Sequence, residues 1–425
     1  MMHAPLSPAA ARPEFAIGFR EFVGIVAALM AVNALGIDMM LPALPAMGHS
    51  LGIAEENQRQ WIIAAYVLGF GSCQLVYGPL VDRFGRKPVL TISLTLSALA
   101  CVAAAALAHD FTTVVAARLL QGMTAAGSRV LAVSIVRDRY SGRQMARVMS
   151  LSFIVFLAVP ILAPSLGQLV MLVMPWPGIF YSLAAFAMAV VLWANLRLPE
   201  TLRPQDRRPI SPRSIMAATR MVLTTPMSIG YTVAATLLFG GLMGYINSAQ
   251  QIFTDVFHEE RLFTIAFAGC AAAMGFSSLL NSRIVERLGT RLVSHSALVA
   301  YVAITGVHAL TAGRGHEDIW TFCAFQAATM ATFSLASSNF NAMAMEPVGH
   351  IAGTAASVQG TISTLGGALL GILIGQAFDG STAPVAIGLF LLGLIALAIV
   401  LLTERGRLFR PQHAAPIVAP LTPAD

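Results

Sequence analysis

Charged residues are scarce in this chain, and long apolar runs take their place. Only 11% of the 425 residues are Asp, Glu, Lys or Arg, whereas 57% are hydrophobic. Soluble domains contain about 25% charged residues, so this composition excludes an ordinary soluble globular protein. It predicts a chain that crosses a membrane many times, with the lipid bilayer as a partner.

Cysteine is also rare, and its placement excludes a disulfide framework. Cys73, Cys101, Cys270 and Cys323 all fall inside apolar runs, which predicts small packing residues rather than redox groups. The nine histidines are scattered, and no loop gathers His, Cys or paired acids at metal-ligand or catalytic spacing. We therefore expect no metal, no cofactor and no enzymatic activity. A membrane-embedded enzyme or receptor is the alternative from another functional class.

Twelve apolar runs are long enough to cross a hydrocarbon core, which takes about 20 helical residues. Divided at charged and at Pro- or Gly-rich breaks, they cover residues 20–46, 59–80, 88–108, 111–136, 145–171, 177–196, 226–251, 262–281, 292–312, 319–344, 352–377 and 383–403. The sequence thus predicts an all-α integral membrane protein with 12 transmembrane helices.

Basic residues gather on one side of these spans. With a cytoplasmic N-terminus, 21 of the 26 Lys and Arg residues lie in inner tails and loops; the exceptions are Arg59, Arg261 and Arg314 outside and Arg118 and Arg129 within spans. The positive-inside rule therefore predicts that both termini are cytoplasmic. The net charge of +6 then needs no nucleic acid partner. With Glu14 and Glu21 and no small-residue cleavage site, the N-terminus does not fit a removed signal peptide.

A polar segment divides the chain into two similar halves. We expect a tail (1–19), a six-helix bundle (20–196), a linker (197–225), a second six-helix bundle (226–403) and a C-terminal tail (404–425). The sequence 286–291 follows the eighth span as 82–87 follows the second, an offset of 204 residues that also relates Gly167 to Gly371. Two pseudo-symmetric bundles with a substrate site between them are typical of transporters.

Two charges inside predicted spans are candidates for proton coupling. Asp38 in the first span and Arg118 in the fourth are expected at similar depth, and each charge costs about 2.5–3.5 kcal/mol at a helix centre. Burial and a facing arginine push the pKa of an aspartate in opposite directions, so movement that separates them can drive proton binding. The alternative is a static ion pair that locks two helices together.

A third buried charge and several amides are candidates for the substrate cavity. Arg129 follows Arg118 by eleven residues, or about 1100° of helix, so the two share one face with Gly122 and Ala125 between them. Arg129 is expected to line a cavity or else to reach the inner interface. The uncharged candidates for ligand contact, each of which is also consistent with a simple interhelical hydrogen bond, are Asn33, Tyr66, Asn247, Gln250 and Gln326.

The turn after the second span is a candidate conformational latch. Gly78 and Gly85 allow close approach and a tight turn, while Asp82, Arg83 and Arg86 can form a breakable charge cluster. The alternative is a solvated, positive-inside turn. Separately, Pro160 and Pro164 remove backbone donors in the fifth span and predict a bend, either structural or involved in gating.

Several of these segments resemble the major facilitator superfamily. Residues 78–87 match its signature G-x-x-x-D-R-x-G-R-[KR], residues 118–122 (Arg-Leu-Leu-Gln-Gly) resemble its fourth-span motif, and residues 163–168 (Ala-Pro-Ser-Leu-Gly-Gln) resemble its fifth-span antiporter motif with two glycines replaced. More closely, residues 38–45, 135–139, 198–202 and 353–357 resemble Bcr/CflA-type drug/proton antiporters with twelve spans.

This resemblance implies proton-coupled efflux of compounds such as chloramphenicol or bicyclomycin across the bacterial inner membrane by a monomer. Asp38 and Arg118 then stand at positions tied to coupling. Related antiporters carry a second acid about two turns before the aspartate, where this chain has Met30. Neutral or weakly anionic small molecules therefore fit better than cationic drugs. A dedicated metabolite exporter or a proton-coupled importer on the same scaffold is the alternative.

Overall fold

The computed structural model describes residues 17–409 except 54, 108, 141, 208, 210 and 316. Within helices it also leaves out the side chains of residues 56, 142, 143, 146, 147, 150, 153–157, 214, 350 and 352. The described chain is helical, and no strand occurs in it. The predicted terminal tails lie largely outside the described residues.

The first half contains six spanning segments. They are α1 (Phe19–Asp38), which continues through η1 (Leu41–Ala43) into α2 (Leu44–Ser50); α3 (Trp61–Phe84), preceded by η2 (Glu56–Gln60); and α4 (Arg86–Ala106), α5 (Phe111–Arg139), α6 (Gly142–Val173) and α7 (Pro177–Arg197). The break after Asp38 divides a segment that the sequence predicts as one continuous helix.

The second half repeats this arrangement. Its segments are α9 (Pro226–Gln251), extended by η4 (Ile252–Val256), then α10 (Glu260–Leu288), α11 (Thr290–Ala312), α12 (Ile319–Met345), η5 (Glu346–Ile351), α13 (Ala352–Gln376) and α14 (Ala383–Thr403). Eleven segments of the described chain are long and apolar enough to cross a membrane, and the 32-residue α6 is the twelfth. The predicted all-α membrane fold is therefore confirmed, and a count of twelve spans is consistent with it.

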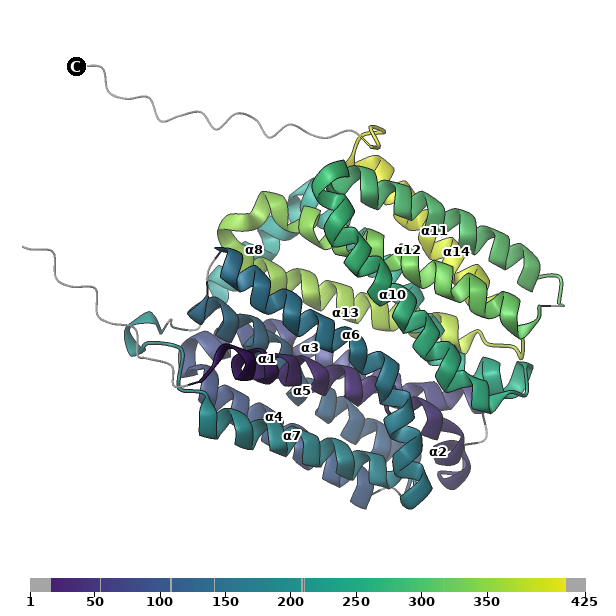
Figure 1. Ribbon diagram of the computed structural model, residues 1–425, viewed down its shortest axis with the longest axis horizontal. Coiled ribbons are helices and arrows are strands. Elements are labelled where there is room, and N and C mark those ends of the chain that lie inside the picture. The colour runs from purple at the N-terminus through teal and green to yellow at the C-terminus, as the bar shows by residue number, and fades with distance from the viewer. Residues whose placement is uncertain are drawn as a thin grey trace, which may run out of the picture.

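The linker between the halves contains secondary structure of its own. It contains η3 (Pro204–Asp206) and a 13-residue helix, α8 (Pro212–Thr224). This helix packs on α13, α9 and η5. In Figure 1 it lies at the same end of the molecule as the two ends of the described chain, whereas α2 lies at the opposite end.

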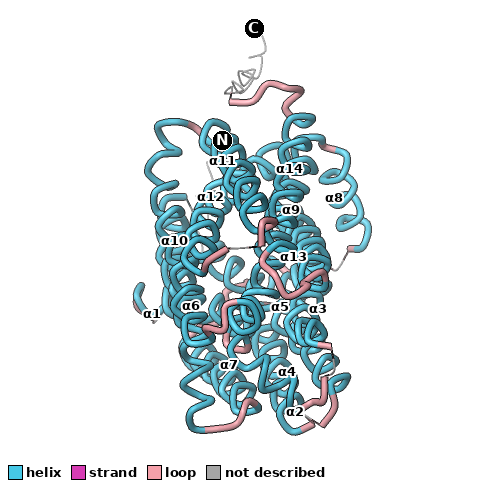
Figure 2. The backbone as a smooth tube through the Cα atoms, turned by 90° about the vertical axis from the view of Figure 1, so that its right-hand side faces the viewer, coloured by secondary structure: helices cyan, strands magenta, loops and turns pink. Residues whose placement is uncertain are grey.

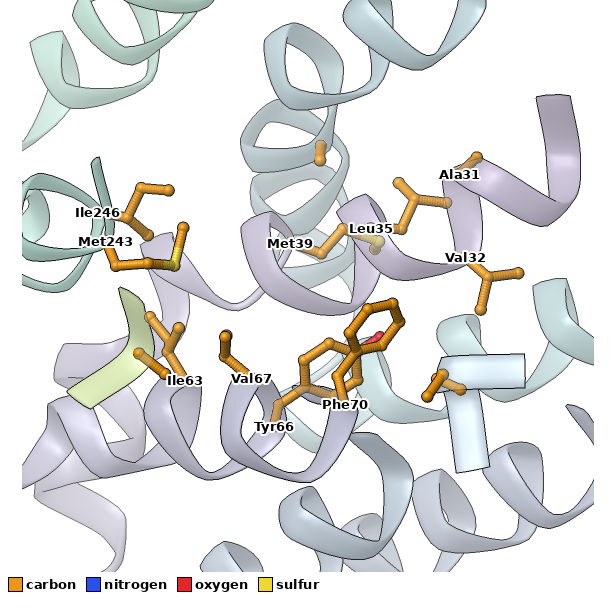
Figure 3. Close-up of a cluster of buried hydrophobic side chains, with 14 of the residues drawn as sticks. Ala31, Val32, Leu35, Met39, Ile63, Tyr66, Val67, Phe70, Met243 and Ile246 are labelled. Atoms are coloured by element: carbon orange, nitrogen blue, oxygen red, sulfur yellow. The ribbon is translucent and has the colours of Figure 1, made fainter. Parts of the chain in front are cut away.

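The two halves meet along two helix pairs. Within each half, α5 packs against α3 and α13 against α9, and contacts between the halves run mainly through α3 with α13 and α6 with α10. The view along the helices in Figure 2 shows the spans gathered side by side with α8 at the edge. Apolar side chains of both halves join one core. In Figure 3, Met243 and Ile246 of α9 lie close to Ile63 of α3.

An aspartate caps the start of the fourth spanning helix in each half. The Asp110 carboxylate accepts hydrogen bonds from the Thr113 hydroxyl and amide at the start of α5, and the Asp318 carboxylate accepts bonds from Trp320 and Thr321 at the start of α12. These bonds lower the pKa of both carboxylates. The bonds from the threonine hydroxyls have the largest effect, and the bonds from the backbone amides come second.

The predicted repeat is visible in the backbone. Gly85 between α3 and α4 has φ +98°, and Gly289 between α10 and α11, 204 residues later, has φ +81°. Side chains other than glycine rarely adopt such angles, so each half makes its second turn in the same way with the same residue.

Candidate functional site

Asp38 lies at the last residue of α1, where the helix gives way to a turn. Its side chain is buried, and the structure gives its carboxylate no hydrogen bond or ion pair with any described residue. The helix end is fixed by close packing instead. A Cβ atom at Gly167 of α6 would overlap the Met39 carbonyl oxygen, so only glycine lets α6 approach α1 directly after Asp38.

Arg118 is fully buried in α5 and is held by three neighbours. Nε donates to the Ile62 carbonyl oxygen at 2.9 Å, one terminal nitrogen donates to Gln121 Oε1 at 2.7 Å, and the other donates to the Gly36 carbonyl oxygen at 2.8 Å. The guanidinium also lies 4.6 Å from the centre of the Tyr66 ring. Arg118 therefore joins α1, α3 and α5.

The expected ion pair between Asp38 and Arg118 does not form in the described structure. Arg118 contacts α1 at Gly36, two residues before Asp38, and its nitrogens donate to two backbone carbonyl groups and one side-chain amide. The prediction that the two residues lie at similar depth agrees with this contact. The interaction reaches the backbone of α1 rather than the carboxylate.

Two glycines bring α3 and α5 into backbone contact beside Arg118. A Cβ at Gly122 would overlap the Tyr66 carbonyl oxygen, and one at Gly69 would overlap the Leu119 carbonyl oxygen. Each helix thus presents a glycine to a carbonyl of the other. This packing positions the Ile62 carbonyl for Arg118 and Tyr66 beneath its guanidinium.

Of the other predicted cavity residues in the first half, two belong to this cluster. The Tyr66 ring lies beside Arg118, and the Tyr66 hydroxyl donates to Asn33 Oδ1 at 3.3 Å. Arg129 differs, because its side chain is exposed and makes no hydrogen bond or ion pair within the described part of the chain. Arg118 and Arg129 thus share one face of α5, but Arg118 is buried and hydrogen-bonded whereas Arg129 is exposed.

The predicted amides of the second half are buried in separate places. Asn247 and Gln250 lie in α9, where Gln250 Nε2 donates to Thr254 Oγ1 at 2.8 Å. Gln326 in α12 is fully buried, and neither amide atom has a hydrogen-bond partner among the described residues. A buried, unsatisfied amide costs about 1–3 kcal/mol, which favours a bound water or ligand at this position.

A set of amides that the sequence did not single out together links the two halves at the end near α2. Gln60 Nε2 donates to Gln251 Oε1 at 2.6 Å and to the Gly375 carbonyl at 2.9 Å, and Gln251 Nε2 donates to Asn57 Oδ1 at 3.0 Å. Gln376 Nε2 donates to the Asn57 carbonyl at 2.7 Å and to Gln60 Oε1 at 3.3 Å. We call Asn57, Gln60, Gln251 and Gln376 the amide clasp.

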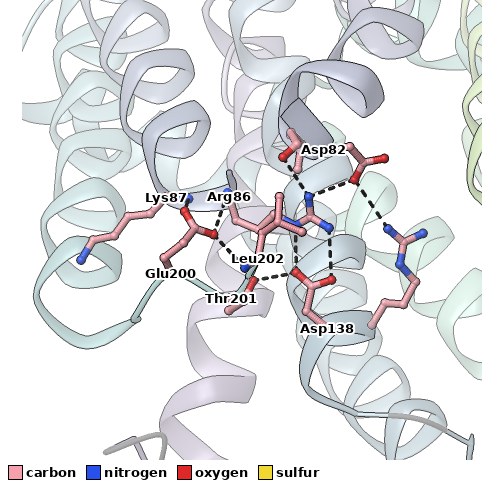
Figure 4. A network of polar contacts seen from close by, with 9 residues as sticks. Asp82, Arg86, Lys87, Asp138, Glu200, Thr201 and Leu202 are labelled. Carbon is pink, nitrogen blue, oxygen red and sulfur yellow. Dashed lines mark hydrogen bonds and ion pairs between the residues drawn. The ribbon is translucent and has the colours of Figure 1, made fainter. Parts of the chain in front are cut away.

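The predicted latch is an extended charge network at the opposite end (Figure 4). Arg86 donates to Asp82 at 2.9 Å, to the Val81 carbonyl at 2.8 Å and with two nitrogens to Asp138 at 2.8 and 3.1 Å. The network joins the end of α3 to the end of α5. Among the described residues, Asp82 makes no bond to the second half, and exposed Arg83 makes no ion pair.

Glu200 completes this network from the segment after α7. Its carboxylate accepts from the backbone amides of Arg86 at 2.9 Å and Lys87 at 3.1 Å, so it caps the start of α4. Thr201 donates to Asp138 at 2.7 Å. Only the resemblance pointed to the segments that carry Asp138 and Glu200, because nothing in their own spacing shows that they meet at Arg86.

The second half has a related cluster at the equivalent turn. Glu404, 204 residues after Glu200, accepts from Arg291 Nε at 3.0 Å and from the Tyr231 hydroxyl at 2.5 Å. The Tyr231 hydroxyl also lies 3.0 Å from His295 Nε2, and His295 Nδ1 accepts from the Phe409 amide at 3.1 Å. In each half, a glutamate that follows the last helix, Glu200 or Glu404, therefore hydrogen-bonds to the turn after the second spanning helix.

Pro160 and Pro164 lie inside α6, which stays helical on both sides of each. The predicted bend remains a prediction. A cavity of about 380 Å³ lies elsewhere, between η4, α10 and α12, and none of the predicted site residues lines it. Its lining consists of Phe253, Leu262, Ile265, Ala266, Gly269, Cys270, Ile319, Trp320, Cys323, Ala324 and Ala327.

Comparison with known proteins bears on this arrangement. The model of the Major Facilitator Superfamily matches residues 26–371. The chain is 30% identical over 382 residues to the "Uncharacterized MFS-type transporter YdgK" of Bacillus subtilis, covering 88% of this chain and 91% of the relative. It is 27% identical to a "Bicyclomycin resistance protein homolog" of Haemophilus influenzae (90% and 96% covered) and 28% identical to "Multidrug resistance protein MdtL" of Escherichia fergusonii (80% and 85% covered).

A solved structure shares the fold. The human organic anion transporter MFSD10 (TETRAN) superposes with a TM-score of 0.65 at 18% identity, covering 89% of this chain and 99% of that one. The family match spans most of the twelve segments, including the glycine-lined α3–α5 contact and the Arg86 network. This multi-pass membrane protein therefore belongs to the Major Facilitator Superfamily.

Proposed function

We propose that this protein exports small amphipathic drugs or toxic compounds across the bacterial inner membrane in exchange for protons. This proposal is supported by the chain's membership of a transporter family. It is also supported by similarity over most of its length to relatives named for bicyclomycin and multidrug resistance. In this proposal it acts as a monomer whose two halves alternate access to a central site.

Asp38 is the proposed proton-binding residue. It is buried at the end of α1, beside the Arg118 contact at Gly36, and its carboxylate has no described partner. A buried carboxylate without a partner favours the protonated form, whereas access to water or to Arg118 favours the ionised form. Movement at the break between α1 and η1 can switch between these environments.

Arg129 is the proposed cavity charge. Its exposed side chain on α5 is available to an anionic or polar group of a substrate, while Arg118 on the same helix is fully engaged. Asn33, Tyr66, Asn247, Gln250 and Gln326 are the proposed polar contacts. Neutral and weakly anionic substrates suit this set better than cations do, since Met30 replaces a second acid in α1.

The two ends of the molecule are proposed to act as gates. With both termini cytoplasmic, the amide clasp lies on the external side and closes it, and the Arg86 network lies on the cytoplasmic side. The structure then corresponds to a state closed to the outside. Outward opening requires breaking the clasp.

The test is transport into inside-out vesicles driven by a proton gradient, with chloramphenicol and bicyclomycin as probes. Asp38→Asn should abolish gradient-driven uptake while exchange of labelled probe across the membrane without a gradient persists. Glu55→Gln, which neutralises an exposed acid, is the matched control and should transport normally. Undiminished gradient-driven uptake by Asp38→Asn would reject Asp38 as the coupling residue, and no uptake of any probe by the unmodified protein would reject drug export.

A further inference from the structure

The helix α8 in the linker has a position that no transport step explains. It connects the end of α7 to the start of α9 through short segments, and it lies at the periphery of the bundle. In Figure 1 it runs across the direction of the spanning helices rather than along them. In the chain, α8 lies between the end of one spanning helix and the start of the next, and the ends of spanning helices are where lipid headgroups are expected.

One face of α8 is fixed to the second half. Ala218 and Val222, one turn apart, are buried, and Val222 packs in a small apolar cluster with Val348 of η5 and Ala355 and Val358 of α13. This packing holds the helix in place and determines which of its residues point away from the protein.

The exposed face combines apolar and basic side chains. Met216 and Leu223 are 70% and 49% exposed, and they are seven residues apart, so they lie within about 20° of each other around the helix. Arg213 and Arg220 have the same spacing, and Arg220 lies about 40° from Met216. An apolar stripe thus runs beside a basic stripe over two turns.

The charge of this face has no counterpart in the part of the chain that the structure describes. The helix contains no acidic residue, and neither the Arg213 nor the Arg220 guanidinium forms an ion pair or hydrogen bond with another described residue. Large exposed apolar side chains are costly in water, and unpaired arginines beside them match a surface that is apolar below and negatively charged above.

We propose that α8 rests on the membrane surface, with Met216 and Leu223 at the acyl boundary and Arg213 and Arg220 on the phosphates of anionic lipid headgroups. Each arginine near an anionic leaflet contributes about 1 kcal/mol, and the interaction weakens as salt screens it. Because α8 is fixed to η5 and α13, the lipid contact anchors the junction of the two halves at a defined depth.

Hydrogen exchange of the full chain in lipid nanodiscs tests the proposal. Peptides from residues 212–224 should exchange about 30-fold more slowly in phosphatidylcholine with a quarter phosphatidylglycerol than in phosphatidylcholine alone, the factor expected for two arginines. The double variant R213Q/R220Q should lose this difference, and 0.5 M salt should reduce it. R283Q, which removes an exposed arginine near the end of α10, should keep it.

Equal exchange in the two lipid mixtures would overturn the proposal, as would a difference that R213Q/R220Q retains. A second measurement addresses the apolar stripe. In a background without the four native cysteines, a nitroxide at Met216→Cys should be more accessible to oxygen than to a polar nickel reagent, and one at Ala217→Cys less so. Equal, water-like accessibility at both positions would show that α8 faces the aqueous phase.

Discussion

Gln60 offers the sharpest test of how the two halves are held together. Its side chain makes three hydrogen bonds across the interface, two as donor to Gln251 and the Gly375 carbonyl and one as acceptor from Gln376. A hydrogen bond of this kind contributes about 0.5–1.5 kcal/mol net. Gln60→Leu keeps a similar volume but can make none of them, so the clasped state should lose about 3 kcal/mol relative to an opened one.

A loss of about 3 kcal/mol changes the ratio of the two states by about 150-fold. The assay is a distance measurement by double electron–electron resonance between nitroxides at Glu55 and Glu260. Both positions are exposed; Glu55 precedes η2 in the first half and Glu260 begins α10 in the second. In a background without native cysteines, the unmodified protein should give a dominant short distance. Gln60→Leu should transfer most of the population to a longer one.

Gln58→Leu is the matched control, because Gln58 lies in the same η2 turn, is exposed and makes no side-chain hydrogen bond within the described chain. It should leave the distance distribution unchanged. If Gln60→Leu also leaves it unchanged, or if Gln58→Leu shifts it as much, the clasp does not hold the halves together.

Three further substitutions test local packing and capping. Gly122→Ala should lower thermal stability, because the added Cβ meets the Tyr66 backbone and overpacking costs about 1–3 kcal/mol; a melting curve equal to that of the unmodified protein would contradict the α3–α5 contact. Glu200→Gln should destabilise by about 1 kcal/mol in the same assay, since one amide oxygen cannot replace a carboxylate that caps both Arg86 and Lys87 amides. Asp110→Ala should melt lower at pH 7, and the deficit should disappear as the pH falls through the lowered pKa of Asp110, because a depressed folded-state pKa stabilises only above that value; a deficit independent of pH would show that the carboxylate is not the cap.

The spans, the two halves and the repeated turn could be predicted from the sequence, because the length of an apolar run and a glycine at a turn are local features. Gly85 and Gly289 can be recognised as paired from their spacing alone, and the structure gives both the same left-handed backbone. The break after Asp38 was missed although Pro42 and Pro45 signal it. Each proline stands in the first turn of a new helical segment, η1 or α2, where its missing N–H is tolerated.

Side-chain partners were harder to predict, because they depend on how helices rotate and tilt. Burial of Arg118 near α1 was foreseeable from its depth, but its choice of the Gly36 carbonyl over the Asp38 carboxylate was not. Likewise, Gln60 and Gln376 are distant in sequence and carry no motif, so only the packing of α3 on α13 brings them together. The apolar and basic spacing of α8 is present in the sequence, but we did not predict a helix there because the segment 197–225 is polar as a whole.

The cluster around Glu404 bears on how the protein should be tagged. The last spanning helix ends at Thr403, yet Glu404 and Phe409 beyond it bond to Arg291, Tyr231 and His295. A fluorescent protein or affinity handle joined directly after Thr403 would remove these fastenings while leaving every membrane crossing intact. Fusions for expression screening or microscopy should therefore begin after Phe409, so that these bonds to the second half are retained.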